Sequence, residues 1–415
     1  MHPIELDPKL GPVVFLGGIN AMPMMYALEL RKKGIEVLYF VDCPESDTLS
    51  RPENHFQDIR YPYPNWIVEW VLPTQIVLPL FPRCFAYFTK QRIFKKTKKP
   101  PQAIFLNGFF CSLAPYFMQG VPKIFLPGGS DLDSWADVER ADNLGESFSN
   151  RSIFKYIPKI ISKKIIKKIV KRQFFGASKC SKVVYFPKGF NEAGDKVLSR
   201  LEDENVEVLG RYDVSFEPLK YERRGVVNEN NNMVIFSGVR FIFKTFPDGN
   251  MEYSKGNNII IEGLAQYYQR NKNIEVHFVE KGEDVSEEKK MCTELGLTDV
   301  VIWHKEMKFT ELLRLYQKAD VCFDQVGKHW IGAIGIYALW LGKPLISNDE
   351  RAINNGLWDA EAPILSAKTA LQIKEQLIRL ESLELRRSIS QRSMDFSEAR
   401  LGPQKVLKTI FNGIS

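Results

Sequence analysis

Short apolar runs alternate with longer amphipathic stretches through the first half of the chain. GPVVFLGGIN ends near paired glycines, AMPMMYALELRKKG has a helical pattern ending at Gly34, and IEVLYFVD is a second apolar run. Strands of parallel sheets read as continuous apolar runs, so this order predicts a βαβ unit. Further strands are predicted in four ranges, 102–107, 121–131, 182–187 and 206–213.

The alternation begins again after a polar segment. Residues 216–232, FEPLKYERRGVVNENNN, have the composition of an interdomain linker. Beyond it, strands predicted in NMVIFSG, NIEVHFVE, DVVIWHK and DVCFDQV alternate with helices, and IGIYALWLGKPLIS predicts one more helix and strand. We therefore predict an α/β protein with two doubly wound parallel-sheet domains, whose ligands bind at the carboxyl ends of the strands.

Composition agrees with two globular domains. The chain has 415 residues, of which 44% are hydrophobic and 26% charged. Its six cysteines form no CxxC pair, which argues against a disulfide framework or a zinc site and favours a reducing cytosol. The first residues lack the basic start and apolar run of a secretion signal, so we expect a cytoplasmic protein.

The net charge of +7 is concentrated in two segments. Residues 151–175 contain nine Lys or Arg and no acid, and residues 90–99 contain six more and no acid. A local basic patch indicates an acidic partner. Nucleic acid is a poor match because no aromatic-interleaved reading motif accompanies the lysines.

The first basic segment has a helical period. Isoleucines recur every fourth residue from Ile153 to Ile169, and lysines do so two positions later, so the two sets face opposite sides of a helix predicted at about 157–175. Such a helix suits an anionic membrane surface. It equally suits a surface helix whose isoleucines lie in the core. The lysines assigned to the membrane patch are Lys159, Lys163, Lys167 and Lys171.

The segment 61–100 is aromatic and apolar before it becomes basic. Glu69 and three prolines interrupt the roughly 20 apolar residues that a spanning helix needs. Two interpretations remain, helices dipping into a membrane face with Trp66 and Trp70 at the headgroups, or a buried helical hairpin.

From Met233 to Ser347 the chain resembles the donor domain of GT-B glycosyltransferases, in particular the retaining family with a Glu-x7-Glu motif. FSGVR, SKGNNIIIEGLA, LGLTDVVIW, FTELLRLYQKADVCF and LGKPLIS occur in the order of that family. The resemblance implies a first domain at 1–215, a linker at 216–232, a nucleotide-sugar domain at 233–395, and a C-terminal helix at 396–415 that packs back toward the first domain.

Aligned on Leu-Gly-Lys-Pro, the two glutamates of the family correspond to His329 and Tyr337, and its glycines to Gly332 and Gly335. In the family these positions contact the sugar, the ribose and the diphosphate. Glycine lets the backbone approach a diphosphate, and a helix N-terminus attracts it. Both replaced glutamates are departures from the family pattern.

The diphosphate-binding Arg and Lys of the family correspond to Arg240 and Lys255, with Lys244 as a rival of Lys255. Two cations stabilise the charge that develops on a leaving nucleoside diphosphate, so no metal and no cofactor are expected.

In the first domain, Asp131 is the candidate catalytic residue, although an Asp there also suits a helix N-cap. The glycine loops are expected to admit acceptor or phosphate; their residues are Gly17, Gly18, Gly129 and Ser130.

The resemblance implies a metal-independent, retaining hexosyltransferase. Its partners would be a nucleotide sugar, a lipid-linked or polysaccharide acceptor and the anionic inner face of the cell membrane. Two alternatives stay open, a catalytically degenerate membrane-associated binding protein and a sugar-nucleotide 2-epimerase.

Overall fold

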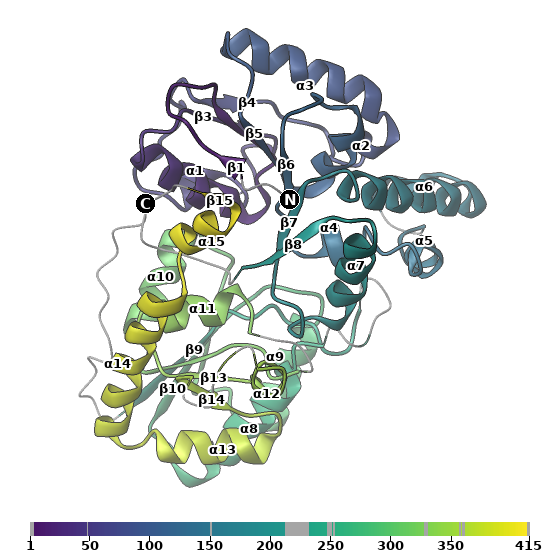
Figure 1. The fold of residues 1–415 in the computed structure, drawn as a ribbon. Helices are drawn as coiled ribbons and strands as arrows, with labels where there is room; N and C mark the ends of the chain where they lie inside the picture. The colour runs from purple at the N-terminus through teal and green to yellow at the C-terminus, as the bar shows by residue number, and fades with distance from the viewer. Residues whose placement is uncertain are drawn as a thin grey trace. The chain divides into compact units, whose positions relative to one another are not determined.

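The structure is a computed structural model that describes residues 4–47, 49–149, 152–211, 232–246, 251, 254–327, 331–356, 358 and 362–412. It divides into unit 1, Met1–Tyr212 with Pro403–Ser415, and unit 2, Asp213–Gly402. The predicted linker 216–232 lies outside the described residues except for residue 232. Each unit is built on a parallel sheet with helices around it, which confirms the predicted fold class (Figure 1).

The sheet of unit 1 has seven strands in the order β4-β3-β2-β5-β6-β7-β8. All neighbouring pairs are parallel. All residues of the inner strands β2, β3, β5 and β7 are buried, as expected for a sheet covered on both faces, whereas the edge strands β4 and β8 are mostly not. The strands are β2 Val13–Leu16, β3 Val37–Val41, β4 Ile67–Glu69, β5 Ala103–Leu106, β6 Lys123–Phe125, β7 Lys182–Tyr185 and β8 Glu207–Gly210.

Helices connect these strands. The α-helices are α1 Met22–Lys32, α2 Val77–Leu80, α3 Pro82–Lys96, α4 Ser130–Asp133, α5 Ala141–Phe148, α6 Lys159–Ala177, α7 Glu192–Asp203 and α15 Pro403–Ile410. The 3₁₀ helices are η1 Ile19–Ala21, η2 Pro52–Asn54, η3 Gly108–Tyr116 and η4 Ser152–Tyr156. Helices α2, α3 and α6 all pack on η3, so residues 77–96 of the segment 61–100, which had two open interpretations, form helices beside the sheet.

The C-terminal segment belongs to unit 1. Helix α15 packs on α1 and β8, and β15 Phe411–Asn412 pairs in parallel with β1 Ile4–Glu5. The ring of Phe411 lies 5.8 Å from that of Phe105 on β5, and both side chains are buried.

The sheet of unit 2 has six parallel strands in the order β11-β10-β9-β12-β13-β14. Its strands are β9 Met233–Ser237, β10 Ile274–Val279, β11 Val301–His304, β12 Val321–Phe323, β13 Leu345–Ser347 and β14 Ile364–Ser366. Its helices are α8 Asn257–Arg270, α9 Val285–Glu294, α10 Phe309–Lys318, α11 Ala333–Trp340, α12 Glu350–Asn354, α13 Ala370–Arg379 and α14 Leu383–Arg400.

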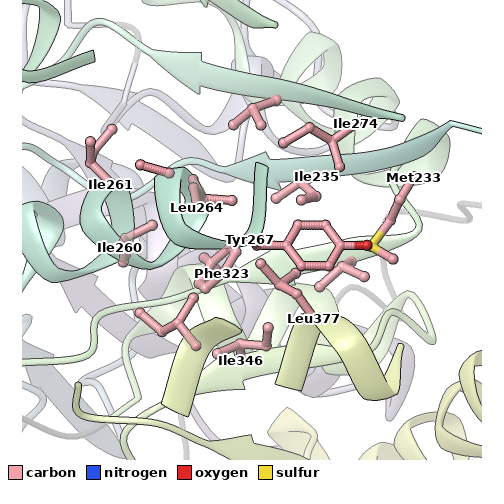
Figure 2. Packing of buried hydrophobic residues seen from close by; sticks show 14 of the residues in the cluster. Met233, Ile235, Ile260, Ile261, Leu264, Tyr267, Ile274, Phe323, Ile346 and Leu377 are labelled. Carbon is pink, nitrogen blue, oxygen red and sulfur yellow. The ribbon is translucent and has the colours of Figure 1, made fainter. Parts of the chain in front are cut away.

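The core of unit 2 lies between this sheet and helices α8 and α13. Figure 2 shows the ring of Tyr267, on α8, among the side chains of Met233 and Leu377. Ile235, Ile274 and other strand residues complete the cluster. Because the core residues come from strands and helices alike, they hold the strand ends in fixed positions.

Helix α6 starts and ends two residues later than predicted. Ile157, Ile165 and Ile169 of its isoleucine stripe pack into a core cluster with Trp135 and Phe154, whereas Ile161 is 49% exposed. The core interpretation therefore holds for most of the stripe.

Candidate functional site

The strand order of unit 2 reverses between β9 and β12. The chain runs from β9 outward to β10 and β11, then returns to β12 on the other side of β9. Ligands of doubly wound sheets bind at this switch point, outside the carboxyl ends of the strands. The segments that follow these two strands, 238–242 and 324–327, therefore form the first part of the candidate site.

A third segment, 254–256, packs tightly against these two. The N–H of Lys255 donates to the carbonyl of Ile242 at 2.7 Å, and the carbonyl of Lys255 accepts from the N–H of Val326 at 3.1 Å. Gly256 has φ +71°, and a Cβ there would lie 2.7 Å from the nitrogen of Gly327. The backbone of Lys255 is thus fixed between the segments that follow β9 and β12.

The residues before α11 contact a buried carboxylate, that of Asp324, which directly follows β12. Asp324 accepts a hydrogen bond from the N–H of Gly332 at 2.5 Å. A Cβ on Gly335 would lie 2.5 Å from Oδ2 of Asp324, so this glycine is required by the carboxylate. Burial raises the pKa of Asp324 to about 6, while N–H groups and the charge of Lys255 act in the opposite direction. Lys255, Gly332 and Gly335 are therefore brought together around Asp324.

Arg240 and Lys244 lie along the segment that follows β9, and each forms an ion pair. Nη2 of Arg240 is 2.8 Å from Oε1 of Glu283, and Nζ of Lys244 is 2.7 Å from Oε2 of Glu287. The Arg240 and Lys244 side chains are 49% and 63% exposed. Exposed pairs of this kind contribute little free energy, so Arg240 can exchange its partner at small cost.

Tyr337 packs within unit 2. Its ring lies 4.9 Å from that of Phe309 on α10, and burial raises the pKa of its hydroxyl above the usual range. His329, the other replaced position, lies outside the described residues.

Unit 1 has its own switch point, between β2 and β5. Gly17, with φ +89°, follows β2, and a Cβ there would lie 2.6 Å from the carbonyl oxygen of Asn107, which follows β5. A Cβ on the adjacent Gly18 would lie 3.0 Å from the hydroxyl of Tyr39. Both glycines are thus explained by close packing of the loops.

Asp131 holds the neighbouring loops in place. Its carboxylate accepts from the N–H groups of Gly108, Gly128 and Gly129 at 2.8–3.0 Å. Burial raises the pKa of Asp131 to about 6. Gly129, with φ +146°, has no atom within 4 Å of an added Cβ, and Ser130 is exposed, so this loop is open on its outer side.

The lysines assigned to the membrane patch mostly face α5. Lys159 and Lys163 pair with Glu146, and Lys167 pairs with Asp142. Lys171 is exposed. Two acids from a different helix thus offset part of the charge of these four lysines.

The two tryptophans of the patch flank strand β4, where the sequence indicated helices. Pairing with β3 and the 2.5 Å ion pair between Glu69 and Arg51 explain the strand. Trp66 lies under the guanidinium of Arg31, and Trp70 packs against Arg92 and two phenylalanine rings. Both are half-buried.

Within the described residues, no helix is long and apolar enough to cross a bilayer. In the same residues, no three His, Cys, Asp or Glu side chains are grouped so as to hold a metal ion.

Residues 247–394 match the family Glycosyl transferases group 1. The matched segment includes α8 to most of α14, and with them the 254–256 segment, Asp324 and the start of α11. No curated protein matches the sequence.

Solved structures resemble the whole chain. Sucrose-phosphate synthase from Thermosynechococcus elongatus has a TM-score of 0.57 at 13% identity, covering 97% of this chain and 94% of that one. Anabaena HepE in complex with UDP has 0.56 at 13% identity, covering 96% and 99%. A putative UDP-N-acetylglucosamine 2-epimerase from Listeria monocytogenes has 0.52 at 11%, covering 95% and 92%. At these identities the likeness shows the GT-B fold alone.

Asp324, which accepts a hydrogen bond at the start of α11, was not predicted as a site residue from the sequence. A signal was present, since an Asp directly after a predicted strand lies at the ligand-binding edge of a parallel sheet. The glycine pattern instead predicted site residues at and just before α11, namely Gly332, Gly335 and Tyr337.

Proposed function

We propose that the protein is a glycosyltransferase that binds a nucleotide sugar at the switch point between β9 and β12. It transfers the sugar, with retention and without a metal, to a lipid-linked or polysaccharide acceptor at the inner face of the cell membrane. The observation that carries the proposal is the clamped position of Lys255 beside Asp324 and α11, inside a group 1 domain.

The chemistry follows from the charges. The bond between the anomeric carbon and the diphosphate oxygen breaks, and negative charge develops on the leaving diphosphate. The acceptor oxygen bonds to the anomeric carbon, and the proton of the acceptor hydroxyl passes to the leaving diphosphate. Lys255, whose backbone is held by two hydrogen bonds, neutralises this charge. Arg240 also binds the diphosphate after its ion pair with Glu283 breaks. Asp324 orients the start of α11 by accepting from Gly332.

In unit 1 the loop with Gly129 and Ser130 supports an acceptor role because it is open on its outer side. Asp131 acts there as a positioning residue, since three backbone N–H groups already use its carboxylate. No catalytic base is assigned.

Calorimetric titration with UDP, GDP, ADP and CMP tests the donor site. One nucleotide should bind selectively, and UDP is the first to test because the structure of Anabaena HepE contains it. Lys255→Ala and Arg240→Ala should each weaken that nucleotide by at least about tenfold, because a hydrogen bond to a charged group contributes about 1.5–3 kcal/mol.

Lys244→Ala is the matched control, since Lys244 lies on the same segment as Arg240 but pairs with Glu287 at the start of α9. Its affinity should stay within about twofold of the parent. The donor site is wrongly assigned if no nucleotide binds, or if Lys244→Ala weakens binding as much as Lys255→Ala.

The packing of Tyr337 against Phe309 favours a second candidate, a degenerate transferase that binds a nucleotide without turnover. Release of sugar from the matching nucleotide sugar separates the two. Turnover supports the enzyme, whereas tight nucleotide binding with no sugar release supports the binding protein.

A further inference from the structure

Helix α3 of unit 1 exposes large aromatic side chains. Pro82, Ala86, Thr89 and Ile93 form its buried face, on η3 and α2. On the outward side, Tyr87, Phe88 and Phe94 are 59%, 51% and 39% exposed. Phe81, which precedes the helix, is 62% exposed. Single exposed apolar residues are ordinary, but a group on one short helix indicates an interaction surface.

The same helix is basic and has no acid near it in sequence. Residues 70–130 contain no Asp and no Glu. The exposed cations on α3 are Arg83, Lys90, Arg92, Lys95 and Lys96. Within the described part of the chain, Lys90, Lys95 and Lys96 form no ion pair, and Lys90 lies 6.0 Å from the ring centre of Phe94. Aromatic and basic side chains are therefore interleaved on one face.

This face differs from the lysine face of α6. Three of the four α6 lysines assigned to a membrane are paired with Asp142 or Glu146, so two acids offset much of the charge of these three. The α3 lysines keep their charge toward solvent, next to rings that can enter an apolar layer. Helix α6 also exposes Ile160, Ile161 and Phe175, but acids lie beside its lysines, whereas the α3 cations have no acid near them in sequence.

We infer that α3 is the surface by which unit 1 docks on an anionic lipid bilayer. Tyr87, Phe88 and Phe94 would lie at the level of the headgroups, where aromatic rings are favoured, and the lysines would meet lipid phosphates. The inference names the surface for the membrane location in the proposed function, and it does not depend on the donor site.

The native Cys84 provides a probe on this helix. Cys84 is exposed, whereas the other five cysteines are buried, so a thiol-reactive, environment-sensitive dye will label α3 selectively. Labelled protein is titrated with vesicles of phosphatidylcholine, alone or mixed with phosphatidylglycerol. We expect the dye emission to rise and shift to shorter wavelength only with the anionic vesicles, and the change to shrink with added salt.

Sedimentation of unlabelled variants with the same vesicles measures how much the lysines and the aromatic residues of α3 contribute to vesicle binding. Lys90→Ala with Lys95→Ala should weaken binding to anionic vesicles by at least about tenfold. Phe88→Ala with Phe94→Ala should weaken it by a similar factor, since the rings supply the buried apolar area. The matched control removes three paired lysines from α6, Lys159→Ala, Lys163→Ala and Lys167→Ala, and should change binding by no more than about threefold.

Nucleotide titration of every variant separates the two proposals, and urea unfolding of each variant shows whether unit 1 is folded. Variants of α3 should bind nucleotide as the parent does. The inference is overturned if the parent binds nucleotide but no anionic vesicle, or if the α6 variant loses as much vesicle binding as the α3 variants. In either case the donor site is unaffected.

Discussion

The switch points of the two units have the same architecture but different charge. In unit 1, Asp42 and Asp131 lie near β3, β5 and β6, both with pKa values raised to about 6 by burial, and neither forms an ion pair among the described residues. In unit 2, Asp324 has a similar pKa, but Lys255 is fixed next to it. A parallel sheet with glycine loops thus offers a place for a ligand, and the cation decides whether a diphosphate suits it.

Adding one methyl group at each switch point gives the largest effect. Gly256→Ala and Gly17→Ala both place a Cβ under 3 Å from backbone atoms at positive φ. Each should lower the free energy of unfolding by about 2–5 kcal/mol, measured by urea unfolding. Only Gly256→Ala should also lose nucleotide binding. If Gly17→Ala loses it instead, the donor site belongs to unit 1.

The buried carboxyls make stability depend on pH in the same direction in both units. A folded pKa of about 6 exceeds the value of 3.8 for an ordinary Asp, so the folded state binds the proton more tightly. The free energy of unfolding should therefore fall as pH rises from about 4 to about 7, by about 3 kcal/mol per carboxyl.

Unfolding curves of Asp131→Asn and Asp324→Asn between pH 4 and 7 measure how much each carboxyl contributes to this pH dependence, because each variant has lost one of the two titrating groups. Lys255→Ala sharpens the comparison. Removing the cation should raise the pKa of Asp324 further and leave that of Asp131 unchanged. An equal change at both carboxyls would show that Lys255 does not act on Asp324 directly.

The smallest effect is expected at Tyr337. If its ring only packs on Phe309, Tyr337→Phe should change nucleotide affinity by less than about twofold, or about 0.4 kcal/mol. Calorimetry with the nucleotide that binds the parent checks this. A tenfold loss would mean that the hydroxyl contacts the donor.

The sequence was sufficient for the parallel strands, because each is a continuous apolar run ending near polar or glycine residues, as in Val37–Val41 before Asp42. It was not sufficient for contacts between elements. Asp142 and Glu146 lie four residues apart, yet nothing in their spacing shows that they meet the lysines of α6. Strand β4 was missed because three residues carry no measurable period, and its pairing with β3 is non-local.

At the candidate site, the resemblance located Lys255, Gly332 and Gly335 along the chain but not the reason for the glycines. Gly335 avoids a clash with Asp324, a contact between residues eleven positions apart that depends on the turn between β12 and α11. A carboxylate can accept hydrogen bonds from the N–H groups before a helix at many different separations along the chain, so no fixed spacing in the sequence predicts this contact.

The pairing of β1 with β15 sets an order of events during biosynthesis. The chain leaves unit 1 at Tyr212 and returns at Pro403, so 190 residues are translated between them. At about 5–20 residues per second this takes roughly 10–40 s. Until then the ring of Phe105 lacks Phe411, and α1 lacks α15. The nascent first unit thus emerges from the ribosome with an uncovered apolar side, at which a chaperone can act before the last helix arrives.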